Sequence, residues 1–192
     1  MALIAIIVAL LPIQAQLWTA DHAKSHPATF LSGIATGILV HELGHVTVAS
    51  AKGYHVDMNN LTIVYPGAVM SDADHLQVAS AGFQAQWLLS EAVLDSHELQ
   101  HTPTKLNDFA AGLVCSHLAT TAAYLLVLKN QPGNDITGIS EGSGLSRDSI
   151  ALFVAIPAAL DYWRLTGHNV PKWVPALSAT SKGLGISASW TF

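Results

Sequence analysis

Two histidines, His41 and His45, stand four residues apart in the sequence His41-Glu42-Leu43-Gly44-His45. At that spacing both imidazoles lie on one face of an α-helix. Both can then reach a single zinc ion, since a zinc–nitrogen bond is only about 2.0–2.1 Å long. Glu42 projects from a neighbouring direction, where its carboxylate could act as general base on a zinc-bound water. The pattern predicts the chemistry of a zinc hydrolase.

The sequence around this motif is apolar. No charged residue stands between Ala28 and Val40, and after Glu42 none appears until Lys52. Ionisable groups are costly in such surroundings unless they bind something. The alternative is an accidental match on a buried helix whose histidines are hydrogen-bonded within the core. The apolar setting favours the metal site.

The composition places the chain outside the usual range of soluble proteins. Its 192 residues are enough for one domain with a sizeable core. Charged residues make up 11% and apolar residues 51%, whereas charged residues reach about 25% in soluble proteins. The net charge of −5, with eight Lys and Arg, argues against a nucleic-acid-binding surface. The single cysteine, Cys115, excludes an internal disulfide bond.

The apolar stretches predict a mainly α-helical, polytopic membrane protein with about four to five apolar helices. The first stretch has no Lys or Arg before Lys24, which favours a retained membrane helix over the alternative, a cleaved signal peptide. Pro157 interrupts the last stretch. The expected helices are residues 1–20, 27–52, 76–94, 109–128 and 150–165.

The segment after the motif helix changes from helical spacing to a period of two residues. Apolar residues alternate with polar neighbours along it, at Val56 and Met58 and then at Leu61, Ile63 and Tyr65, and Pro66-Gly67 is typical of a turn. The segment predicts a small β-hairpin next to the zinc site.

A catalytic zinc ion needs three protein ligands and one open position, so a third ligand is required. One candidate is Asp161, a carboxylate close to Pro157 in the last apolar helix. The other is Glu91, whose Glu-x-x-x-Asp spacing with Asp95 is similar to that of soluble zinc peptidases with a helical glutamate ligand. Assignment as a protease depends on one of these carboxylates reaching the histidine pair.

Three segments resemble motifs of the site-2 protease family of intramembrane zinc metalloproteases. Residues 41–45 match the family's HELGH form, and residues 81–86 (AGFQAQ) are similar to its AGPxAN segment. Residues 156–161 (IPAALD) are similar to its Pro-rich LDG segment, which supplies the third ligand. Gln86 and Tyr162 stand where the family has Asn and Gly.

The resemblance implies an endopeptidase that hydrolyses a peptide bond of a membrane-anchored protein. Zn²⁺ would be held by His41, His45 and Asp161, with Glu42 as general base. The implied location is the inner (cytoplasmic) membrane of a bacterium, and the implied partners are the substrate protein and the lipid bilayer. Two alternatives stay open: a secreted or periplasmic zinc metallopeptidase that uses Glu91 as third ligand, and a non-catalytic membrane protein that retains a metal site.

These observations divide the chain into three regions. Residues 1–20 form an N-terminal membrane helix or signal peptide, and residues 28–165 form the membrane-embedded metalloprotease core. Within the core, residues 129–148 are rich in Gly, Asn, Ser and Asp, which predicts an exposed loop. Residues 166–192 form a polar tail, and the alternation within residues 185–192 predicts a terminal strand.

Overall fold

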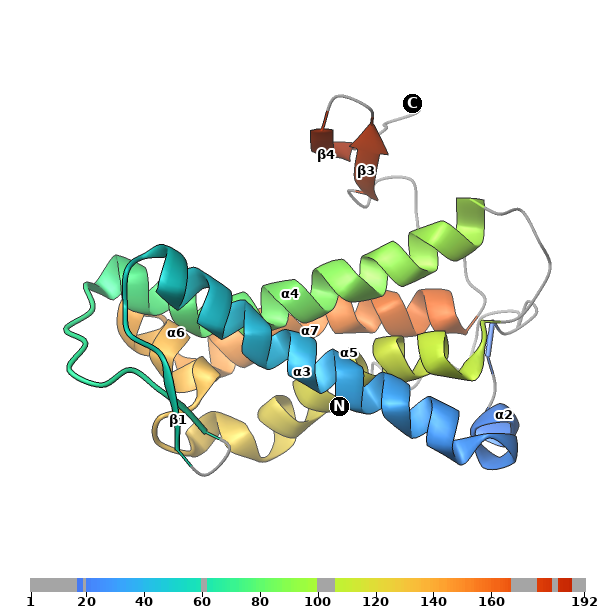
Figure 1. Cartoon of the computed structure of the whole chain (residues 1–192), viewed down its shortest axis with the longest axis horizontal. Coiled ribbons are helices and arrows are strands. Elements are labelled where there is room, and N and C mark those ends of the chain that lie inside the picture. The colour runs from blue at the N-terminus through green and yellow to red at the C-terminus, as the bar shows by residue number, and fades with distance from the viewer. Residues whose placement is uncertain are drawn as a thin grey trace.

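The computed structural model describes residues 17–18, 20–59, 62–99, 106–166, 176–180 and 183–187, which form a bundle of helices and two small hairpins (Figure 1). The expectation of a mainly α-helical fold is confirmed. The helix expected at residues 1–20 lies largely outside the described residues. The elements are α2 (Ala20–Ser25), α3 (Pro27–Ala51), β1 (Asp57–Asn59), β2 (Thr62–Val64), α4 (Asp72–Leu99), α5 (Asp108–Leu126), η1 (Leu128–Asn130), α6 (Asp135–Ser143), α7 (Arg147–Leu165), β3 (Ala176–Thr180) and β4 (Gly183–Ser187).

Helix α3, which carries the motif, begins and ends where the sequence predicts. Pro27 stands in its first turn, where a proline costs no hydrogen bond. Lys52 caps its end and Gly53 follows with a φ of +82°, a left-handed conformation that ends helices. The Lys52 ammonium and the Tyr54 hydroxyl both donate to Asp74 near the start of α4. These bonds join the C-terminal end of α3 to the beginning of α4.

Helix α3 packs against both α4 and α5 (Figure 1), and its contact with α5 is a contact of backbones. A Cβ added at Gly33 would lie 2.2 Å from the carbonyl oxygen of Phe109. A Cβ added at Gly112 would lie 2.3 Å from the carbonyl oxygen of Phe30. Small residues at matching positions permit such an approach in membrane helix pairs. The close approach brings polar side chains of α5 within reach of the motif.

The buried face of α3 is small or polar, and its exposed face is apolar. Leu31, Leu39 and Leu43 are 59%, 57% and 49% exposed. A helix of a water-soluble protein turns such residues inward, whereas a helix in lipid packs its small residues and exposes its large ones. The buried residues are Gly33, Gly37, His41, His45 and Ala49.

Among the described residues, two helices are long and apolar enough to cross a membrane, α3 and α5. Helices α6 and α7, bent by 115° at a short break, would add a third if they form one span. The described residues therefore contain two or three candidate membrane spans, fewer than the four to five apolar helices expected from the sequence. Helix α4 does not qualify, because Asp74, Glu91, Asp95 and several glutamines interrupt its apolar residues.

The expected exposed loop at residues 129–148 is wrong, because this segment contains η1 and α6. Asn134 caps α6 by accepting a hydrogen bond from the backbone of Thr137, at 2.9 Å. Ile136 and Ile139 are buried in a cluster with residues of α4 and α7. Gly144 ends the helix with a φ of +73°. Tertiary burial of two isoleucines thus outweighs a composition typical of loops.

The expected interruption at Pro157 is also wrong, because α7 continues through this residue. A proline inside a helix removes one backbone hydrogen bond. The helix is held on both sides of it by buried residues, with Ile150 and Ala151 before it and Ala158 and Leu165 after it. Packing of these residues offsets the lost bond.

The hairpin expected after the motif helix is confirmed, since β1 and β2 pair antiparallel with Met58 opposite Ile63. In the tail, β4 pairs antiparallel with β3. A strand therefore forms at Gly183–Ser187, while residues 188–192 of the expected terminal strand lie outside the described residues.

Candidate metal centre

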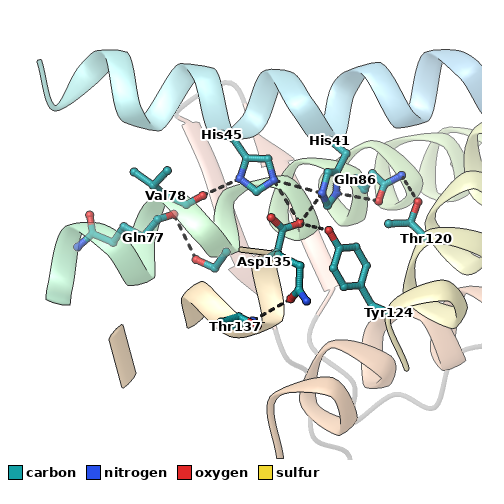
Figure 2. A network of polar contacts seen from close by, with 11 residues as sticks. His41, His45, Gln77, Val78, Gln86, Thr120, Tyr124, Asp135 and Thr137 are labelled. Atoms are coloured by element: carbon teal, nitrogen blue, oxygen red, sulfur yellow. Dashed lines mark hydrogen bonds and ion pairs between the residues drawn. The ribbon is translucent and has the colours of Figure 1, made fainter. Parts of the chain in front are cut away.

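An aspartate that the sequence analysis did not single out completes the group around the two histidines (Figure 2). Asp135 is the first residue of α6, and its Oδ2 lies 2.8 Å from His41 Nε2 and 3.4 Å from His45 Nε2. The two Nε2 atoms are 3.2 Å apart. Both histidines are buried and the aspartate is largely so. The three side chains converge on one point from α3 and α6.

The spacings within this group fit the coordination of one metal ion. Two ligand atoms of a tetrahedral site with bonds of about 2.0–2.1 Å lie about 3.3 Å apart. The separations here are 2.8, 3.2 and 3.4 Å. Two imidazoles and one carboxylate are also a ligand set of catalytic zinc sites, which keep a fourth position for water or substrate. The residues present therefore fit a zinc ion.

The position of Asp135 follows from the start of α6. Gly133 turns the chain with a φ of +69°, and Asn134 caps the helix through Thr137. A carboxylate in the first turn is favoured by the helix dipole. The hydroxyl of Tyr124 on α5 donates to Asp135 Oδ2 at 2.7 Å. These contacts fix the carboxylate before any ligand binds.

The imidazole of His45 is held through its Nδ1 atom, which faces away from Asp135, by a backbone carbonyl. His45 Nδ1 donates to the oxygen of Val78 at 2.7 Å. A backbone carbonyl can only accept, so the proton of the neutral imidazole must sit on Nδ1. His45 Nε2 is left with its lone pair facing His41 and Asp135, as in metal sites where the other nitrogen is fixed by an acceptor.

His41 is held in the same way through a longer chain of hydrogen bonds. The Ser116 hydroxyl donates to the carbonyl of Leu113 at 2.7 Å, so its oxygen accepts from Gln86 Nε2 at 3.4 Å. Gln86 Nε2 also donates to Thr120 Oγ1 at 3.2 Å. The amide therefore turns its Oε1 toward His41 Nδ1, 3.2 Å away. The proton of His41 stays on Nδ1.

When both imidazoles are neutral, the two hydrogen-bond chains leave two Nε2 lone pairs and a carboxylate facing one another in a buried space. Three such acceptors repel one another, and burial makes this repulsion costly. Positive charge between His41, His45 and Asp135 removes it, and either a proton on one imidazole or a bound metal ion can supply that charge.

Substitution of Gln86 by leucine is expected to weaken zinc binding about 10–100-fold, the usual cost of losing an outer partner of a metal-bound histidine. Leucine fills a similar volume but cannot accept the proton of His41 Nδ1. A competition titration with a zinc chelator measures the change. The control is Gln84→Leu, an exposed position of the same helix whose amide donates to the Ser80 hydroxyl. Equal affinity in the wild type and Gln86→Leu would contradict the role given to this amide.

Gly82 of α4 leaves room beside the Nε2 atoms of His41 and His45. A Cβ built at this position would lie 2.4 Å from His45 Nε2 and 2.6 Å from His41 Nε2. No methyl group fits at these distances, so the glycine keeps open the space that an ion needs. Segment 81–86, which the sequence analysis singled out, thus contributes this opening and the amide of Gln86.

A cavity of about 270 Å³ opens beside the group. Its lining includes Glu42, His45, Tyr65 and Asp135. Burial, followed by the charges of Asp135 and Glu42, raises the pKa of Tyr65 to about 12, so this phenol stays protonated at neutral pH. Glu42 borders the same space as two of the ligands, which is where a general base must stand.

Asp161, the expected third ligand, lies elsewhere in the bundle. It is fully buried on α7, and its Oδ2 is 2.7 Å from Nδ1 of His117 on α5. The structure does not bring Asp161 to His41 and His45, because its carboxylate is paired with a different histidine.

Glu91, the alternative ligand, is also engaged elsewhere. Its Oε2 lies 2.7 Å from Arg164 Nη1, and its Oε1 accepts a hydrogen bond from Trp87 Nε1 at 3.2 Å. Asp95 binds the other side of the same guanidinium. Neither of the two carboxylates expected as third ligand therefore reaches the histidine pair.

The sequence analysis misses Asp135 because residues 129–148 have the composition of a loop. A helix signal is nevertheless present. Asn134 is a favoured N-cap residue, and Ile136 and Ile139 follow at helical spacing. Nothing in the local sequence indicates that the start of this helix faces the motif, since that depends on packing between distant segments.

Comparison of the chain with protein-family models, with curated proteins and with solved structures finds no match in any of the three.

Proposed function

We propose that the chain is a membrane-embedded zinc endopeptidase in which His41, His45 and Asp135 hold the ion and Glu42 is the general base. The observation that carries the proposal is the convergence of two Nε2 nitrogens and one carboxylate oxygen within 3.4 Å of one another. This group lies beside a cavity that also contains Glu42.

The chemistry proposed is hydrolysis of a peptide bond. A zinc ion held by His41, His45 and Asp135 would supply a Lewis acid and would lower the pKa of a water molecule to about 7. Glu42 takes a proton from the attacking water, whose oxygen bonds to the carbonyl carbon of the substrate. Glu42 then gives the proton to the amide nitrogen as the carbon–nitrogen bond breaks, which yields a carboxylic acid and an amine. His41 and His45 hold their protons on Nδ1 throughout.

The exposed apolar face of α3 supports a substrate that reaches the site from the lipid phase. Leu39 and Leu43, on the motif helix itself, are 57% and 49% exposed. The proposed substrate is therefore a membrane-anchored protein, and the second partner is the bilayer.

Replacement of Glu42 by glutamine is expected to lower kcat about 10²–10⁴-fold, the range for loss of a general base, with zinc content unchanged. Hydrolysis of a fluorogenic apolar peptide by the full chain in detergent measures kcat, and elemental analysis measures zinc. The control is Glu141→Gln, which removes an exposed carboxylate of α6 that lies near His75. A Glu42→Gln variant with wild-type activity and full zinc would instead favour a non-catalytic metal site.

A further inference from the structure

We infer that Tyr65 is a catalytic residue of this site, whose hydroxyl donates a hydrogen bond to the substrate carbonyl oxygen as that oxygen becomes negative. The inference rests on the proposed function and adds to it the group that stabilises the transition state.

The backbone around Tyr65 is fixed from both sides. Residues 62–64 immediately before it form β2, which pairs with β1. After it, the N–H of Ala68 donates to the Tyr65 carbonyl at 3.1 Å. Pro66 and Gly67, with a φ of +69° at the glycine, give the residue pattern of a type II turn. A residue held between a strand and a tight turn presents its side chain in a defined direction.

The hydroxyl of Tyr65 is left for a ligand. Two tyrosines line the cavity, Tyr65 and Tyr124. Tyr124 already donates its proton to Asp135, whereas the Tyr65 hydroxyl has no hydrogen-bond partner within the part of the chain that the structure describes. Tyr54, at the other end of the hairpin segment, is likewise engaged, since it donates to Asp74.

The charge distribution of the cavity calls for a neutral donor of this kind. Its described lining contains two carboxylates, Glu42 and Asp135, two histidines, His45 and His75, and no Lys or Arg. The carbonyl oxygen of a peptide gains a full negative charge when water adds to the carbon. A zinc ion held by His41, His45 and Asp135 would meet part of this charge, and a hydrogen-bond donor from the protein would meet the rest. Glu42 is then free to accept the proton of the water.

The test compares Tyr65→Phe with the wild type and with Tyr54→Phe, a control that removes a hydroxyl outside the cavity. We expect Tyr65→Phe to lower kcat about 10²–10³-fold, the effect of removing one oxyanion donor, with KM changed less than about 3-fold because the interaction forms only in the transition state. Zinc content is expected to stay the same. A peptide phosphonamidate, which imitates the tetrahedral oxygen, is expected to bind Tyr65→Phe at least about 10-fold more weakly.

The outcomes separate this inference from the function on which it rests. An active wild type with unchanged kcat and phosphonamidate affinity in Tyr65→Phe overturns the inference and leaves the proposed function standing. Loss of zinc in Tyr65→Phe overturns it as well, because the residue would then support the metal site. A zinc-loaded wild type that cleaves no peptide overturns the proposed function and this inference together. If Tyr54→Phe lowered kcat and phosphonamidate affinity as much as Tyr65→Phe, the losses would come from disturbance of the hairpin segment, and the role given to the Tyr65 hydroxyl would be wrong.

Discussion

Asp135→Asn is expected to release the metal ion from the purified protein. The substitution keeps the shape of the side chain and removes the negative charge that lies 2.8 and 3.4 Å from the two Nε2 atoms. Loss of an outer partner alone weakens a metal site about 10–100-fold, so loss of a charged ligand is expected to weaken it by more than about 100-fold. Elemental analysis of the detergent-purified chain measures the ratio of zinc to protein. Peptide hydrolysis should disappear with the ion.

The matched controls are the two carboxylates that the sequence favoured. Asp161→Asn and Glu91→Gln make the same kind of change on α7 and α4, where the partners are His117 and Arg164. Both variants are expected to keep the zinc of the wild type. They should instead lose thermal stability, because Asp161→Asn removes the charged acceptor of buried His117 and Glu91→Gln removes one of the two carboxylates that bind buried Arg164. If Asp135→Asn kept its zinc and Asp161→Asn lost it, the third ligand would be Asp161 on α7 and not Asp135.

Features set by neighbouring residues were predictable from the sequence. The start and end of α3 follow from Pro27 and from Gly53 after Lys52, and the hairpin follows from alternation and from Pro66-Gly67. The histidine pair needs only the pitch of a helix to face one ion. Each of these features involves residues a few positions apart, so local rules suffice.

The third ligand was not predictable in this way, because it depends on which distant segment packs beside the motif. A carboxylate in an apolar helix needs a partner, and this rule pointed to Asp161. Asp161 does have a partner, but that partner is His117 and not a metal site at His41 and His45. Asp135 reaches the site only because Ile136 and Ile139 pack α6 between α4 and α7. The membrane spans were overestimated for a related reason, since α4 uses polar residues such as Gln86 to support the site.

Gly82→Ala is expected to abolish zinc binding without preventing folding. The added methyl carbon would lie 2.4 and 2.6 Å from the two Nε2 atoms, in the space that the ion needs. Alanine is the better helix former by about 0.8–1.0 kcal/mol, which offsets part of an overpacking cost of about 1–3 kcal/mol. The zinc-free variant should therefore lose at most about 2 kcal/mol of stability relative to the zinc-free wild type, and its larger defect should appear when zinc is added.

Thermal unfolding in detergent, with zinc and with a chelator, tests this. Zinc at about 1,000 times its Kd stabilises a protein that binds it by about 4 kcal/mol, so the wild type should melt at a clearly higher temperature with zinc, and Gly82→Ala should not respond. The control is Gly112→Ala, which places a methyl 2.3 Å from the Phe30 carbonyl and forces α3 and α5 apart. It should melt lower under both conditions and still respond to zinc. A zinc response in Gly82→Ala as large as in the wild type would mean that the ion, if it binds, does not occupy the space beside this glycine.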